Sequence, residues 1–166
     1  MKQTEFKCVE TNDQLVVKVI GDISAGTEFP AVALKAHQKM TFQMEDSGYI
    51  NSSGIQSWIK WFKILQEKNA TTTFTFQMLP SNYSHSAYQL RGFLPQRSKV
   101  ESFLAPYFCE SCEKAFNFTF VKGANWKSNW TRDDLIENIK TAPCPKCKKG
   151  SKIDAIPEVF AKVCIP

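Results

Sequence analysis

The most regular hydrophobic pattern in the chain is helical and runs from Gly54 to Lys68. Apolar side chains recur there at positions i, i+3, i+4 and i+7, whereas lysine, glutamine and glutamate occupy the other side. The apolar positions are Ile55, Trp58, Ile59, Phe62 and Leu65. The pattern predicts an amphipathic helix with Lys60 and Trp61 on its exposed side, because Trp61 lies off the apolar stripe.

Alternation of polar and apolar residues predicts the strands. It is cleanest over Thr71–Leu79, where polar residues alternate with Phe74, Phe76 and Met78. Further strands are predicted at Thr4–Val9, Gln14–Ile20, Lys39–Met44 and Lys99–Leu104, with turns at Thr11–Asp13 and Asp46–Gly48.

Two shorter helices complete the first part of the chain. One is predicted at Glu28–Ala36, with Thr27 as its N-cap, and the other at Asn82–Arg91, closed by Gly92. The resulting order of elements is β-β-α-β-α-β-α-β. This order favours an α/β fold, in which helices pack on a mixed sheet of four to five strands.

The cysteines indicate a second domain, because they are unevenly distributed along the chain. The chain has 166 residues, of which 43% are hydrophobic and 22% charged, as in an ordinary globular protein. Of its six cysteines, only Cys8 precedes residue 108. The other five are Cys109, Cys112, Cys144, Cys147 and Cys164. We therefore predict two domains, 1–105 and 106–166, and we interpret Cys8 as a small core residue.

Charge and the amino-terminal sequence bear on compartment and partners. The net charge of +5 permits an acidic partner but does not require nucleic acid. The amino terminus lacks the apolar core of a secretory signal, and no stretch approaches the ~20 apolar residues of a membrane helix. These features predict a cytoplasmic protein without membrane association. Cytosolic cysteines stay reduced, so metal ligands, reactive thiols and small core residues are the interpretations to weigh.

Four of the cysteines form two Cys-x-x-Cys pairs, Cys109 with Cys112 and Cys144 with Cys147. Two such pairs supply the four thiolates of a tetrahedral zinc site. The 31 residues between them exceed the commonest spacing. A predicted strand at Phe116–Phe120 and a predicted helix at Thr131–Lys140 occupy that interval. We expect a zinc-ribbon-like module with a structural zinc ion; iron in the same four-sulfur site is the chemical alternative.

A second hypothesis for this module is nucleic-acid or transcription-associated binding. Lysines 146, 148, 149 and 152 cluster beside the second pair, and Trp126 and Trp130 lie between the pairs. Lysines with aromatic residues can hold a phosphate backbone and stack on bases. Several glutamates and aspartates in the same region dilute this positive charge. Catalysis is not expected, because the only histidines, His37 and His85, lie in no catalytic motif and the chain has no phosphate-binding glycine-rich loop.

The segment Asn51-Ser52-Ser53-Gly54 lies where a predicted strand gives way to the amphipathic helix. Serine hydroxyls at such a position can cap the helix by accepting hydrogen bonds from its free N–H groups. They can equally be phosphorylated, which adds about −1.5 to −2 charges next to the positive end of the helix. The residues themselves leave both interpretations open.

In its context, this segment resembles a known family. Tyr49-Ile50-Asn51-Ser52-Ser53-Gly54-Ile55 resembles the Asp-Ser-Ser-Gly signature of the STAS family, which comprises anti-sigma factor antagonists and the cytoplasmic domains of sulfate transporters. Val19-Ile20-Gly21-Asp22-Ile23 resembles the family's early strand ending in Gly-Glu-Leu, and Leu90-Arg91-Gly92-Phe93-Leu94 resembles its late helix. The resemblance covers about residues 3–105.

The resemblance implies a regulatory protein that binds a protein partner. In phosphorylatable members the serine before the glycine is modified by a serine kinase that is itself the anti-sigma factor, and this position is Ser53, with Ser52 beside it. The implied docking surface comprises Asn51, Ser52, Ser53 and Gly54, together with Lys60 and Trp61 on the following helix. Asn51, Gln43 and Ser24 stand where the family commonly has aspartate. These neutral residues repel a phosphate less and fit equally a docking module without a switch.

Overall fold

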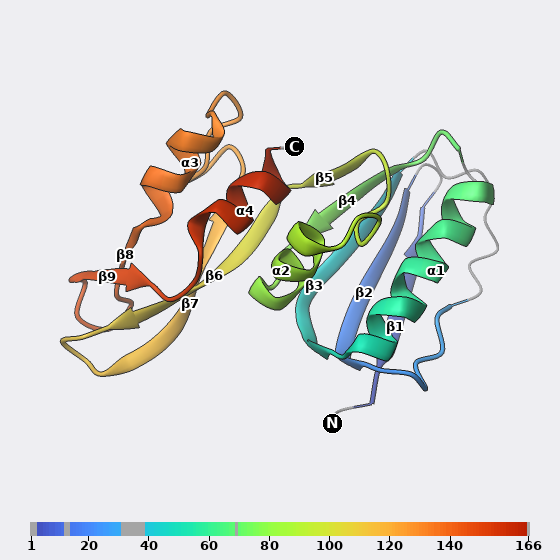
Figure 1. Ribbon diagram of the computed structural model, residues 1–166, viewed down its shortest axis with the longest axis horizontal. Helices are drawn as coiled ribbons and strands as arrows, with labels where there is room; N and C mark the ends of the chain where they lie inside the picture. The colour runs from blue at the N-terminus through green and yellow to red at the C-terminus, as the bar shows by residue number, and fades with distance from the viewer. Residues whose placement is uncertain (1–2, 12–13, 31–38, 69, 166) are drawn as a thin grey trace.

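A computed structural model of the chain describes residues 3–11, 14–30, 39–68 and 70–165. It contains two β-sheets, and helices pack on each of them (Figure 1). The predicted helix Glu28–Ala36 lies outside the described residues from residue 31 onwards, as does His37. No helix among the described residues is long and apolar enough to cross a membrane.

The first sheet confirms the predicted α/β class with a mixed sheet. Its five strands lie in the order β1-β2-β3-β4-β5; β1 is antiparallel to β2, and the other neighbours are parallel. The strands are β1 (Glu5–Glu10), β2 (Gln14–Ile23), β3 (Lys39–Ile50), β4 (Thr73–Gln77) and β5 (Ser98–Val100). Two helices accompany the sheet, α1 (Ser52–Lys68) and α2 (Ser81–Gln89).

The core of this part lies between the sheet and α1. Buried and half-buried residues alternate along β2, as expected for a strand with one face against the core. Phe42 in the first half of β3 contacts the rings of Trp58 and Phe62 on α1, with ring centroids 6.4 and 5.1 Å away. Phe42 also stacks on Phe76, its partner on β4, at 5.2 Å. The predicted amphipathic helix therefore buries its apolar stripe against the parallel strands.

Strand β3 is longer than predicted, and the turn expected at Asp46–Gly48 is wrong. Asp46 and Ser47 continue the pairing with β2, opposite Ile20 and Gly21. The pairing includes two register shifts, and such irregularities bend a strand and increase its local twist without ending it. The Ser47 hydroxyl stabilises the segment by donating to the Met44 carbonyl at 2.7 Å. The continuation brings the Asn-Ser-Ser-Gly segment to the end of a central strand.

The single strand predicted at Lys99–Leu104 is in fact two strands that belong to different sheets. Glu101 separates β5 from β6 (Ser102–Cys109). Its N–H donates to the Phe76 carbonyl of the first sheet at 2.9 Å, and its carbonyl accepts from the Lys122 N–H of the second part at 2.8 Å. The chain passes from one sheet to the other at this residue without a loop, so the sequence pattern shows no interruption.

The second sheet is antiparallel, and its strands lie in the order β7-β6-β9-β8. Its remaining strands are β7 (Lys114–Val121), β8 (Thr141–Pro143) and β9 (Gly150–Ile153), and its helices are α3 (Arg132–Ile139) and α4 (Pro157–Cys164). The predicted helix at Thr131–Lys140 is confirmed as α3, with Thr131 and Asp134 forming a capping box. The short strands β8 and β9 and the helix α4 were not predicted from the sequence.

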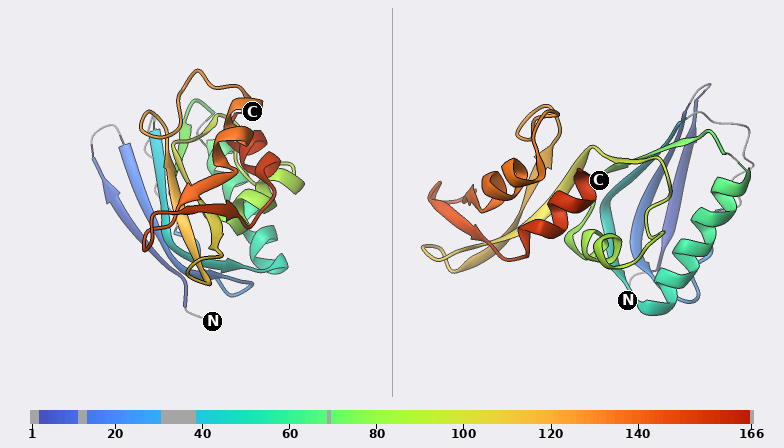
Figure 2. Two further views of the ribbon diagram at one scale, coloured as in Figure 1. Left: turned by 90° about the vertical axis from the view of Figure 1, so that its left-hand side faces the viewer. Right: turned by 45° about the horizontal axis from the view of Figure 1, so that its top comes forward.

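The two parts of the chain are joined by backbone hydrogen bonds and by packing. The Leu79 N–H donates to the Ser102 carbonyl at 3.0 Å, and the Leu79 carbonyl accepts from the Leu104 N–H at 2.9 Å. Helices α2 and α4 lie side by side where the sheets meet (Figures 1 and 2), and the Lys162 amino group lies 4.7 Å from the centre of the Tyr88 ring. The predicted boundary between residues 105 and 106 falls inside β6.

We predict that Phe103 is essential to this junction. It is fully buried and stacks on Phe120 and Phe160, each at 5.0 Å. Replacement Phe103→Ala should lower the free energy of unfolding by about 3–5 kcal/mol, because it leaves a cavity among these rings. Chemical denaturation followed by tryptophan fluorescence measures the change. The control is Phe108→Ala on the same strand, where the ring is 42% exposed. An equal loss in both variants would contradict the prediction.

Candidate metal centre and the Ser53 surface

Each Cys-x-x-Cys pair lies in the turn of a β-hairpin. Cys109 and Cys112 lie at the connection between β6 and β7, whereas Cys144 and Cys147 lie between β8 and β9. Pairing of β6 with β9 places Phe108 opposite Lys152, so both turns lie at the same end of the sheet. The strand pairing therefore brings together two cysteine pairs that are far apart in the sequence.

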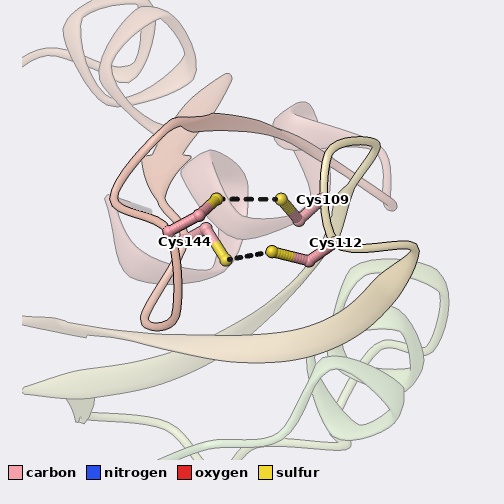
Figure 3. Close-up of side chains that lie close together, drawn as sticks. Cys109, Cys112 and Cys144 are labelled. Atoms are coloured by element: carbon pink, nitrogen blue, oxygen red, sulfur yellow. Dashed lines mark hydrogen bonds between the residues drawn. The ribbon is translucent and has the colours of Figure 1, made fainter.

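The four sulfur atoms form a compact cluster. Sγ of Cys109 lies 3.6 Å from Sγ of Cys147, and Sγ of Cys112 lies 3.9 Å from Sγ of Cys144. All four atoms lie within 4.8 Å of one another, and the side chains point inward from the two turns (Figure 3). A tetrahedron with zinc–sulfur bonds of about 2.3 Å has edges of about 3.8 Å. The cluster thus has the dimensions of a tetrathiolate metal site.

Both turns share an unusual backbone conformation. Glu113 and Lys148, each directly after the second cysteine of its pair, have φ values of 50° and 63°, in the left-handed region. In each turn an amide donates back to the carbonyl of the first cysteine: Cys112 to Cys109 at 3.3 Å and Lys148 to Cys144 at 2.9 Å. Glycine at residues 113 and 148 would have indicated a left-handed conformation in the sequence. The glutamate and lysine that occupy these positions give no such indication.

Hydrogen bonds favour ionisation of two of the thiols. Burial raises the pKa of Cys109, but the side chain of Ser151 and the backbone N–H of Cys112 outweigh it and lower that pKa to about 6. The pKa of Cys144 is lowered mainly by the backbone N–H of Cys147. The pKa of Cys112 is raised to about 12, chiefly by the neighbouring Cys147 sulfur. Four thiolates at these distances repel one another, and a divalent cation among them removes that repulsion.

The inserted helix α3 is fixed to the strand that leads into the first turn. Tyr107, two residues before Cys109, is fully buried, and its hydroxyl donates to the carbonyl of Ile139 at the end of α3. Burial raises the pKa of Tyr107 well above its ordinary value, so the group stays protonated as a donor. The end of α3 is therefore held against strand β6, whose last residue is Cys109.

Of the two tryptophans considered for base stacking, one is buried and the other half-buried. Trp126 is only 1% exposed and packs against Phe103, with ring centroids 5.9 Å apart. Trp130 is half-buried and packs against the hydrophobic core. Of the lysines near the turns, Lys152 forms an ion pair with Glu110 at 3.1 Å. The expectation that these tryptophans provide a stacking surface is therefore wrong for Trp126.

At the start of α1 the capping residue is Asn51, not a serine. Its side-chain oxygen accepts from the Gly54 N–H, and its carbonyl accepts from the Ile55 N–H, both at 2.8 Å. Ser52 and Ser53 lie in the first turn with exposed side chains. Gly54 is buried, and a Cβ atom there would lie 2.4 Å from the Ile23 carbonyl oxygen. Close contact between α1 and the end of β2 therefore requires the glycine and leaves both serines facing solvent.

Trp61 does not belong to the exposed side of α1, so that expectation is wrong. It is 7% exposed and stacks on Phe29 at 5.0 Å, with Phe6 at 5.8 Å. Phe6 on β1 and Phe29 after β2 lie against one side of α1. They cover Trp61, so the buried face of α1 is wider than the apolar stripe predicted from the sequence. Lys60 is exposed, as predicted.

Two further residues differ from expectation. Cys8 is exposed rather than part of the core, because β1 is the edge strand of its sheet. Tyr49, not singled out from the sequence, is 62% exposed close to the serine pair. Its backbone is held in place, since the Tyr49 N–H donates to Asp22 Oδ1 at 2.8 Å and Asn82 donates to the Gly48 carbonyl at 3.1 Å. An exposed tyrosine has no periodic signal, so the sequence could not distinguish it.

No family model matches the chain, and no curated protein is significantly similar to it. The cysteine cluster and the turn around Ser53 are therefore the basis for the function proposed below.

We predict that the left-handed conformation of Lys148 makes this site sensitive to side-chain shape. Lys148→Gly should keep or raise the free energy of unfolding, whereas Lys148→Val should lower it by about 1–2 kcal/mol, because a branched side chain clashes in this conformation. Thermal or chemical denaturation measures both. The control is Lys149→Val, at an exposed neighbour whose φ is not positive. Equal effects of valine at the two residues would contradict the prediction.

Proposed function

We propose that the chain is a non-enzymatic regulatory domain that binds a protein partner through the surface around Ser53. The resemblance of this segment to the STAS signature suggests an anti-sigma factor or serine kinase as the partner. The carboxy-terminal part is, in this proposal, a zinc-ribbon-like module. The described cysteines form no disulfide, which fits a reducing compartment such as the cytoplasm.

The accessibility of Ser53 is the observation that carries the proposal. Because Asn51 caps α1, the Ser53 hydroxyl is not needed for helix capping and lies at the surface. The first turn of α1 contains no acidic residue, so a phosphate there meets no repulsion from the helix itself. Phosphorylation would add about −1.5 to −2 charges. A partner that binds the unmodified surface would then meet a changed charge and shape.

The surface around Ser53, which we call the Ser53 surface, comprises the exposed side chains of Tyr49, Ser52, Ser53 and Lys60, beside the capping residue Asn51. Tyrosines are enriched among residues that contribute most to protein interfaces. Here the hydrogen bonds to Asp22 and Asn82 hold the backbone next to Tyr49 before any partner arrives, which lowers the entropy lost on binding. Tyr49 therefore replaces Trp61 as the aromatic contact in the proposal.

In the zinc-ribbon-like module, Cys109, Cys112, Cys144 and Cys147 would hold the metal. Four protein sulfurs complete a tetrahedral shell and leave no position for water or substrate, so the ion would stabilise the fold rather than react. Zinc fits the donor set and the dimensions of the cluster, and iron fits the same donors. Each hairpin alone is too small to form a core, which agrees with a structural role for the metal.

The charge at residue 53 provides the test of the proposed function. Ser53→Asp, which supplies part of a phosphate's charge, should reduce capture of the partner from native cell extract at least about tenfold, whereas Ser53→Ala should leave it unchanged. Quantitative mass spectrometry of the captured proteins measures this ratio. Ser128→Asp is the control, because it adds the same charge at an exposed residue of the second part. Equal capture by the Asp and Ala variants at Ser53 would exclude the switch.

A further inference from the structure

A polar cavity of about 280 Å³ lies at the opposite end of α1 from Ser53. Gln66 lies 13 residues after Ser53 on α1, about 20 Å away along the helix axis, so this cavity is separate from the Ser53 surface. The cavity lies where β4 and β5 begin. The described residues that line it are Gln66, Ala70, Thr72, Phe74, Gln96 and Arg97.

Arg97 is the only charged residue among those lining residues, and no carboxylate is among them. One of its terminal N–H groups donates to the Ala70 carbonyl. A guanidinium has five N–H donors, and within the described part of the chain this side chain makes no other hydrogen bond. The bond to Ala70 anchors the group while leaving most of its donors free.

The backbone of Arg97 is also unusual. Its φ is 60°, in the left-handed region that favours glycine. The Arg97 carbonyl accepts from the Phe74 N–H of β4 at 3.3 Å, which holds the residue at the mouth of the cavity. A long cationic side chain therefore occupies a residue at which glycine would suit the backbone better. Such strained positions are concentrated at ligand-binding sites.

We propose that this cavity binds a small oxyanion, a phosphate or carboxylate group, through the guanidinium of Arg97. The planar group presents parallel N–H donors that match two oxygens of either anion. The amides of Gln66 and Gln96, which line the same cavity, supply further donors. The volume exceeds what inorganic phosphate alone would fill, so the anionic group belongs to a small molecule or to a side chain that enters the cavity.

The test is a titration of the full-length protein, followed by two-dimensional amide NMR, with sodium phosphate and separately with sodium acetate at constant ionic strength. We expect saturable shifts at Thr72, Gln96 and Arg97. Arg97→Gly should weaken the binding at least about tenfold, since it removes charge-assisted hydrogen bonds. Because glycine suits the φ of 60°, this variant should fold with an unchanged or raised melting temperature.

Two further variants test whether the binding depends on the position of the charge and on the guanidinium group. Arg91→Ala removes one positive charge from an exposed residue outside the cavity, and it should leave the affinity unchanged. Arg97→Lys keeps the charge but loses the paired donors, so it should bind more weakly than the native protein. Saturation by phosphate alone or acetate alone identifies the anion, and saturation by both indicates a general oxyanion site. Absence of saturable shifts with either anion, or equal affinities of native protein and Arg97→Gly, would overturn the proposal.

Discussion

The arrangement of the whole chain depends on strand β6, because its backbone hydrogen-bonds both to its own sheet and to the segment that follows β4 of the first sheet. At its start it bonds to Leu79, which lies between β4 and α2. Along its length it lies between β7 and β9, and its last residue is Cys109. One strand therefore places the first cysteine turn relative to the first sheet, and its pairing with β9 places the second turn beside it.

The second constraint is electrostatic. Four thiolates around a divalent ion carry two net negative charges, and the protein must accommodate them near a partly buried site. Backbone and side-chain donors lower the pKa of Cys109 and Cys144, which provides part of this compensation. With a metal bound as proposed, the exposed lysines of the second turn and of β9 would add positive charge at longer range. These residues are Lys146, Lys148, Lys149 and Lys152.

The features that the sequence predicts correctly are those encoded by local periodicity or spacing. The helix over α1, the strand β4, the capped helix α3 and the two cysteine pairs all fall into this class. The failures arise where distant residues decide the outcome. Trp61 is buried because Phe6 and Phe29 lie against it, and Glu101 divides a strand because it bonds to both sheets. Tyr49 and the pocket at Arg97 depend on contacts across the fold, which no local pattern reports.

X-ray absorption spectroscopy of the purified protein at the zinc edge tests the proposed metal site. We predict a metal ion with four sulfur neighbours at about 2.3 Å and no nitrogen or oxygen ligand. If the same four-sulfur shell is found at the iron edge instead, the four-cysteine site is correct and the bound metal is iron. A mixed sulfur and oxygen shell, or an unaltered spectrum in the Cys144→Ser, Cys147→Ser double variant, would contradict the proposed site.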